Sequence, residues 1–169
     1  LKSNVIVLPE KPPEGVALQD RAILCGRGTI APADSWMGRI IDPNGKPLDG
    51  RPMLRGALSR PLYAEPPNVA FRRPLGDRMS TGMAVTDTLL PIVRGQRVGL
   101  FAGSGVGKSS LLGSFAADIQ ADVVVIAMIG ERGREVRHFV EKIIGPKGMK
   151  RTVVVAATSD QSPLQRRRC

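Results

Sequence analysis

Aromatic side chains are scarce in this sequence: Phe, Trp and Tyr make up 4% of its 169 residues. The net charge of +10 makes nucleic acid the first partner to consider. Proteins that hold single strands need aromatic rings on which the bases stack, and we interpret Trp36 and Tyr63 as packing residues. The basic residues are scattered, and their one dense run, 166–168, stands at the very end. We therefore expect no specific nucleic-acid partner.

Cysteine, histidine and long apolar runs are equally rare. Cys25 and Cys169 form neither a CxxC pair nor a metal-binding spacing, which is typical of a reduced cytoplasmic protein. His138, the single histidine, lies off the apolar face of its expected helix and is interpreted as a solvated surface residue. The longest clean apolar run, 123–129, is far too short to cross a bilayer, and no secretory segment opens the chain. Because the chain begins with Leu1 rather than Met, we expect a piece of a longer protein.

The first half of the chain is rich in proline and turn residues. Short apolar stretches at 4–8 and 22–25 predict β-strands. Residues 43–78 hold many of the prolines and much of the arginine, and they predict a loop-rich connection rather than a periodic helix. Three acidic residues stand among turn residues and are interpreted as turn formers: Asp34, Asp42 and Asp49.

From about residue 81, apolar runs alternate with helical patterns. Continuous Val and Ile strands joined by helices predict a parallel sheet that is buried on both faces. The predicted fold class is therefore α/β, with ligands at the carboxyl ends of the strands. The expected strands are 97–101, 122–129 and 151–157, and the expected helices are 108–119 and 136–144, the second of which Gly145 and Pro146 should end.

The segment 102–109, Ala-Gly-Ser-Gly-Val-Gly-Lys-Ser, predicts a phosphate-binding loop between a strand and a helix. Its glycines allow backbone N–H groups to approach the phosphates of a nucleotide, and the positive end of the helix dipole points the same way. Lys108 is expected to contact the outer phosphates, and Ser109 to bind Mg²⁺. Ala102 replaces the usual first glycine, which is a modest departure. The predicted nucleotide-binding residues are Gly103, Ser104, Gly105, Val106, Gly107, Lys108, Ser109 and Ser110.

A second polar group, Gly130-Glu131-Arg132, directly follows the expected strand 122–129. In a parallel sheet Glu131 then lies at the same edge as the phosphate loop, where it can orient the water that attacks a γ-phosphate. Glu131 can equally be a loop acid that caps the next helix, because negative charge is favourable at a helix N-terminus. Spacing alone leaves both interpretations open. Arg132 is expected to pair with an acidic neighbour or to face another subunit.

Three segments together resemble the flagellar protein-export ATPases and the related type III secretion ATPases, and more distantly the catalytic subunit of rotary ATP synthases. The resemblance runs from about residue 20 to about residue 164. Gly133, before Arg-Glu-Val, favours the export branch, since the synthase motif usually has Thr there. The segments are 102–109, 129–136 (Ile-Gly-Glu-Arg-Gly-Arg-Glu-Val) and 157–164 (Ala-Thr-Ser-Asp-Gln-Ser-Pro-Leu), with matching pieces upstream at 38–50 and 81–87.

The resemblance implies a partial RecA-like core preceded by a small β-barrel. Residues 1–30 would be the last part of the barrel. Residues 31–169 would be an incomplete nucleotide-binding domain, with 31–80 as a lead-in and 81–169 as the phosphate-loop βαβ core. The Asp that organises Mg²⁺, the arginine finger and the residue that contacts adenine would lie outside these residues, so the chain alone is expected to be poorly active.

The resemblance also implies a function and a set of partners. Lys108, Glu131 and Arg132 would act in catalysis, with ATP and Mg²⁺ as ligands. The family forms a homohexamer in the cytoplasm, peripherally associated with the inner-membrane export gate. Its partners are regulatory and stalk proteins of the export apparatus, export substrates and their chaperones.

We therefore expect ATP binding and hydrolysis that energises protein export by the flagellar type III secretion apparatus. Three alternatives stay open. The chain can be an inactive truncated nucleotide-binding fragment, or the catalytic subunit of a rotary proton-translocating ATP synthase. It can also be a ring-shaped RNA translocase, which the basic charge favours and the scarcity of stacking aromatics disfavours.

Overall fold

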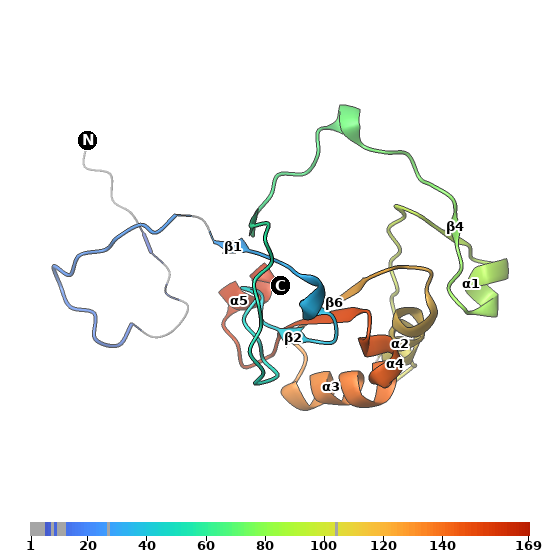
Figure 1. Cartoon of the computed structure of the whole chain (residues 1–169). Helices are drawn as coiled ribbons and strands as arrows, with labels where there is room; N and C mark the ends of the chain where they lie inside the picture. Colours follow the sequence, from blue (N-terminus) through green and yellow to red (C-terminus); the bar gives the residue numbers. More distant parts are fainter. Residues whose placement is uncertain (1–5, 8, 10–12, 27, 104) are drawn as a thin grey trace.

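A three-stranded parallel sheet forms the centre of the molecule (Figure 1). It has the order β2-β7-β6, where β2 is Ile40–Ile41, β6 is Val124–Ile129 and β7 is Thr152–Ala157. β6 and β7 pair along their whole length. The predicted α/β fold with a parallel sheet is thereby confirmed. This computed structural model describes residues 6–7, 9, 13–26, 28–103 and 105–169.

Helices gather on one side of this sheet, as Figure 1 shows for α2, α3 and α4. α2 spans Lys108–Asp118 and α3 spans Gly133–His138. The π-helical turn η3, Phe139–Ile144, follows α3 directly and leads into α4, Gly145–Met149. The apolar side chains of these helices meet the middle strand in a core made of Ala116, Phe139, Ile144 and Val154.

A smaller core covers the other face of the sheet. Successive residues of a strand point to opposite faces, so Val153 packs there with Trp36 and Ile41, while Val154 packs under the helices. Trp36 ends the short 3-10 helix η1, Asp34–Trp36. β6 lies at the edge of the sheet, and its Val125 is 65% exposed.

The remaining elements are short and lie in long connections. In Figure 1, two segments extend away from the sheet: residues 13–26 and the connection that contains η2. The antiparallel pairs are β1, Thr29–Ile30, with β3, Arg60–Pro61, and β4, Arg78–Met79, with β5, Ile92–Val93. The short helices are η2, Val69–Phe71, α1, Ala84–Thr88, and α5, Pro163–Arg168.

Two predicted strands are wrong. The segments 22–25 and 97–101 carry no strand. A strand is stable only when a neighbour takes up its backbone hydrogen bonds, and neither segment has such a neighbour in the described chain. Phe101 is accordingly 95% exposed. For the predicted strand 4–8, residues 6 and 7 carry no regular structure, and 4, 5 and 8 lie outside the described residues.

The expected stop at Gly145 is only a break. Gly145 has φ of 66°, which interrupts the helix, but α4 begins at once with Pro146 in its first turn. The helix also starts at Gly133, earlier than the apolar period indicated, and becomes π-helical from Phe139.

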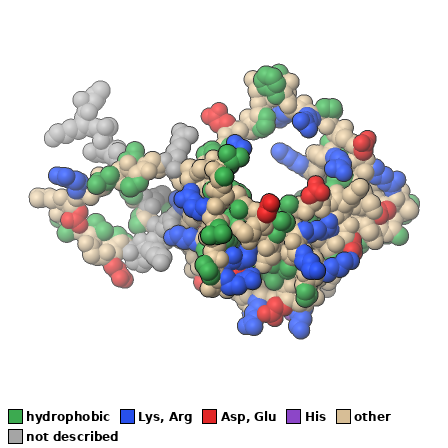
Figure 2. Space-filling model, viewed as in Figure 1, with side chains coloured by type: hydrophobic (Ala, Val, Ile, Leu, Met, Phe, Trp, Pro, Cys, Tyr) green, Lys and Arg blue, Asp and Glu red, His purple; other side chains and the backbone are tan. Residues whose placement is uncertain are grey.

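Lys and Arg side chains are spread over the visible face of the molecule in Figure 2 rather than gathered in one patch. This distribution agrees with the scattered positions of the basic residues in the sequence. Within the described residues, every helix is too short or too polar to span a membrane.

Candidate active site

The predicted phosphate-binding loop is an exposed turn that leads directly into α2. Gly105 has φ of 78° and Gly107 has φ of 92°, in the left-handed region that glycine adopts without strain. A Cβ on either residue would meet nothing within 4 Å, so backbone conformation rather than space requires these glycines. The carbonyl of Gly107 accepts the N–H of Leu111 at 3.0 Å, which starts the helix. Ser104 lies outside the described residues.

The first turn of α2 presents Lys108 and Ser109 to solvent. The first N–H groups of a helix have no partner inside it, and the helix dipole adds partial positive charge there. No acidic residue neutralises the first turn of α2. The N-terminus of this helix, with the ammonium group of Lys108, therefore favours an anion.

The opposite end of α2 is fixed to the rest of the domain. The guanidinium of Arg151, just before β7, donates to the carbonyls of Ala121 at 2.7 Å, Ala117 at 2.9 Å and Ala116 at 3.2 Å. The N–H of Gln120 donates to the carbonyl of Ser80 at 2.8 Å. α2 is thus held at its carboxyl end, while its amino end is open to solvent.

Glu131 stands in the loop after β6, and this loop is bonded to the end of β7. The N–H of Gly130 donates to the carbonyl of Ala157 at 2.8 Å, and the N–H of Ser159 donates to the carbonyl of Glu131 at 3.0 Å. These bonds join the loops that follow the two neighbouring strands. They place the half-buried Glu131 at the carboxyl edge of the sheet, as the sequence predicts.

One cleft of about 800 Å³ brings the two predicted groups together. Lys108 and Ser109 lie on one wall, and Glu131 lies on the other. The floor between them is formed by apolar side chains from β6 and the helices. The lining residues are Lys108, Ser109 and Leu112 of α2, Ile126 to Ile129 of β6, and Glu131, Arg134, Glu135, His138, Phe139 and Ile143.

Two carboxyl groups lie side by side on the second wall. A hydrogen bond between the side chains of Glu131 and Glu135 is the main cause that holds the pKa of Glu135 below its usual value. The N–H of Arg132 also donates to Glu135 Oε2, at 3.4 Å. The wall that faces Lys108 therefore carries two carboxyl groups, those of Glu131 and Glu135.

Not every predicted residue faces this cleft. The side chain of Arg132 is 66% exposed and forms an ion pair with Glu135 at 3.7 Å, so it pairs with an acidic neighbour. Ser110 lines a separate depression on the other side of α2, together with Gly113 and Lys142.

Sequence reasoning missed the other polar residues of the cleft, which are Arg134, Glu135 and His138. His138 is exposed, as expected, but it also lines the cleft. These residues were missed because the sequence pattern did not predict that α3 begins as early as Gly133. From that start, the helical spacings of three and four residues place all three side chains on the face next to Glu131.

Comparison with known proteins gives one consistent family. Residues 82–169 match the nucleotide-binding domain of the ATP synthase alpha/beta family. The chain is 42% identical over 168 residues to the flagellum-specific ATP synthase of Caulobacter vibrioides, covering 98% of this chain and 38% of that protein. It is 51% identical over 130 residues to the flagellum-specific ATP synthase of Salmonella typhimurium, covering 77% and 28%.

A solved structure agrees with these relatives. The ATPase EscN of the enteropathogenic E. coli type III secretion system, assembled and in complex with its central stalk EscO, superposes with a TM-score of 0.76 at 39% identity. The superposition covers 83% of this chain and 35% of EscN. The chain spans about a third of the length of the proteins it matches.

Proposed function

Because the chain belongs to the ATP synthase alpha/beta family, we propose that its cleft binds Mg-ATP and that the protein hydrolyses ATP to energise flagellar protein export. One observation carries the proposal: Lys108, Ser109 and Glu131, predicted from two separate motifs, line the same cleft. The relatives favour flagellar export over a rotary synthase, since those of Caulobacter and Salmonella are flagellum-specific and EscN is an ATPase of a type III secretion system.

The phosphate loop supplies most of the binding. The N–H groups of Gly103, Ser104, Gly105, Val106 and Gly107, followed by those of Ser109 and Ser110 at the start of α2, surround the phosphates. Lys108 adds a flexible ammonium group for the outer phosphates. Ser110 contributes through its backbone, which explains why its side chain can line another surface.

The residues of the cleft fit Mg²⁺. Mg²⁺ prefers oxygen ligands and keeps several waters, so one or two protein groups and the substrate phosphates are enough. The Ser109 hydroxyl would hold the ion, and the carboxyl groups of Glu131 and Glu135 are within the same cleft. The described chain has no cluster of three or more acidic, His or Cys side chains for an all-protein metal site. When bound, Mg²⁺ supplies positive charge to the phosphate oxygens.

Hydrolysis needs a positioned water more than a covalent intermediate. Glu131 orients this water for attack on the γ-phosphorus and accepts its proton, while the bond to the β,γ-bridging oxygen breaks and ADP leaves. Glu135 holds the guanidinium of Arg132 beside the loop of Glu131 through their ion pair at 3.7 Å. Arg132 would act beside Glu131, by releasing Glu135 and turning toward the nucleotide or a neighbouring subunit.

The proposal extends to the assembly. We infer a homohexamer with ATP at the subunit interfaces, located in the cytoplasm at the base of the export apparatus and peripherally associated with the inner membrane. A stalk protein is expected as a partner because EscN, at 39% identity, is solved in complex with its stalk EscO. Regulatory proteins, export substrates and their chaperones complete the set of partners.

Complementation tests the proposal in cells. A strain that lacks the gene should regain secretion of flagellar proteins with the full-length wild-type gene and not with Lys108→Ala. Lys46→Ala is the matched control, since Lys46 is an exposed lysine in the turn after β2. Equal secretion by the Lys108→Ala strain would remove the cleft from the export function.

A further inference from the structure

α2, which carries Lys108 and Ser109, contacts η3 where Gly113 faces Ile143, a residue that also lines the cleft. A Cβ on Gly113 would lie 2.1 Å from Cγ2 of Ile143, about 1.3 Å inside the 3.4 Å at which ordinary van der Waals contact begins. The carbonyl oxygen of Ile143 would be 3.3 Å away. Gly113 is buried in the interior of α2. Unlike Gly105 and Gly107, it is required by space rather than by a left-handed φ.

We propose that the Gly113–Ile143 contact sets the width of the cleft and thereby the distance between the phosphate loop and Glu131. The inference rests on the proposed function. Ser109 lies one helical turn before Gly113, about 6 Å away along α2. Glu135 lies eight residues before Ile143, along the opposite wall. A separation of α2 from η3 at this contact would shift the amino end of α2, with Lys108 and Ser109, relative to α3, which carries Glu135.

The branched side chain of Ile143 limits how far its Cγ2 can move away from Gly113. Cγ2 is attached directly to Cβ, and a β-branched side chain has one strongly preferred χ1 in a helix. The neighbouring Phe139 and Ile144 are fixed in the main core, with 3% and 4% exposure. An atom added at Gly113 therefore displaces α2, which Arg151 holds at its other end. The displacement appears at the amino end of α2, next to Lys108.

Gly113 acts as a positioning residue, because it has no side chain to touch the nucleotide. Gly113→Ala should lower kcat by about 10- to 100-fold, since a misplacement of 1 Å costs up to about 100-fold. The Kd for Mg-ATP should change less than about threefold, because the phosphate loop and Lys108 move with α2 as one unit. Alanine is the better helix former, so lost helix propensity cannot explain the lower rate.

Two double variants of the full-length protein test whether the contact with Ile143 causes the lower kcat of Gly113→Ala. Ile143→Leu removes the β-branch and keeps the number of carbon atoms, so Gly113→Ala/Ile143→Leu should recover most of the lost kcat. Ile143→Val keeps the β-branch, so Gly113→Ala/Ile143→Val should stay slow. Tm is measured for each variant, so that activity is compared per folded protein.

A distance measurement makes the test independent of ATP hydrolysis. Spin labels are placed at Ser114 of α2 and Arg137 of α3, both exposed, after Cys25, Cys169 and every further cysteine of the full-length protein are replaced by Ser. The separation should grow by about 1 Å in Gly113→Ala, return with Ile143→Leu and stay enlarged with Ile143→Val. An unchanged separation, or equal rescue by Leu and Val, would overturn the inference. A wild-type protein without ATPase activity would contradict only the proposed function. The distances between the spin labels would still test the Gly113–Ile143 contact.

Discussion

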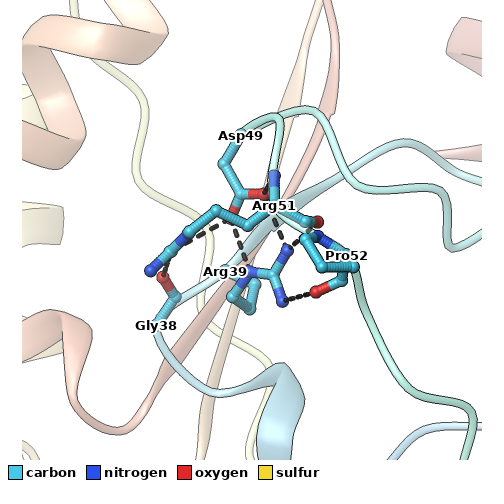
Figure 3. A network of polar contacts seen from close by, with 5 residues as sticks. All are labelled: Gly38, Arg39, Asp49, Arg51 and Pro52. Carbon is cyan, nitrogen blue, oxygen red and sulfur yellow. Dashed lines mark hydrogen bonds and ion pairs between the residues drawn. The ribbon is translucent and has the colours of Figure 1, made fainter.

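Arg39 donates two hydrogen bonds to the carboxylate of Asp49, from Nε to Oδ2 at 2.6 Å and from Nη2 to Oδ1 at 2.7 Å (Figure 3). Arg39 also donates to the carbonyls of Arg51 and Pro52, so it ties the loop after β2 to the sheet. Arg39 is 8% exposed. Removing one partner of a nearly buried ion pair leaves the other charge without compensation.

Asp49→Asn should therefore lower the Tm, on the order of 5–10 °C at pH 7. Asp122→Asn is the control, because Asp122 is an exposed carboxylate on the surface before β6. Thermal unfolding followed by circular dichroism measures both variants. Equal Tm values for the two variants would show that the Arg39–Asp49 pair adds nothing to stability.

The same pair predicts a pH dependence. The pKa of Asp49 lies far below its ordinary value of 3.8, chiefly because the carboxylate accepts a hydrogen bond from Arg39. A carboxyl group with a lowered folded pKa stabilises the fold above its unfolded pKa, and this stabilisation is lost as the pH falls toward the folded pKa. The Tm difference between wild type and Asp49→Asn should be constant above about pH 5 and shrink below about pH 4. A difference that is the same at pH 3 and pH 7 would contradict this assignment.

The carboxyl end of α2 supplies a third prediction. Arg151→Met removes the donor to three carbonyls, which are then left without that partner, and should destabilise the fold by about 2 kcal/mol. Lys150→Met is the matched control, since the neighbouring Lys150 is exposed. Chemical denaturation of both variants checks the effect. A loss of the same size in Lys150→Met would assign it to lost charge rather than to the anchor of α2.

The central strands and α2 could be predicted from sequence because their apolar patterns are local. The run from Val123 to Ile129 is rich in β-branched residues, which favour a strand, and the glycines before Lys108 allow the tight turn that starts α2. The segment 97–101 also carries apolar residues but forms no strand, since strand formation depends on a neighbour that the segment itself does not encode.

The two motifs that line the cleft could be predicted from the sequence. The contacts that hold the neighbouring elements in place could not. Sequence placed Lys108 and Glu131 at the same edge of the sheet, and both line the cleft. Asp49 forms a turn as interpreted, since its carboxylate accepts the N–H of Arg51 at 3.2 Å, but it also pairs with Arg39 ten residues away. Nor can spacing reveal that Arg151 reaches back to Ala116, 35 residues earlier. Such contacts depend on how the elements pack, which is a property of the whole fold.

Glu131→Gln separates binding from hydrolysis. The amide keeps the size of the side chain but cannot accept the proton of the attacking water, so kcat should fall by at least about 100-fold. The Kd for Mg-ATP should stay within a few-fold, because Glu131 lies on the wall opposite the phosphate loop. Glu141→Gln controls for lost charge, since Glu141 pairs with Arg137 on the surface of the helix. A Glu131→Gln protein with wild-type kcat would leave Glu131 as a loop acid only.

Titration of Mg-ATP into the full-length wild-type protein and into Lys108→Ala tests the central claim most directly. The cleft predicts saturable binding by the wild type and a large loss of affinity in the variant, because the outer phosphates lose their cation while the fold keeps its Tm. Binding of equal strength by both proteins would contradict the assignment of this cleft as the nucleotide site.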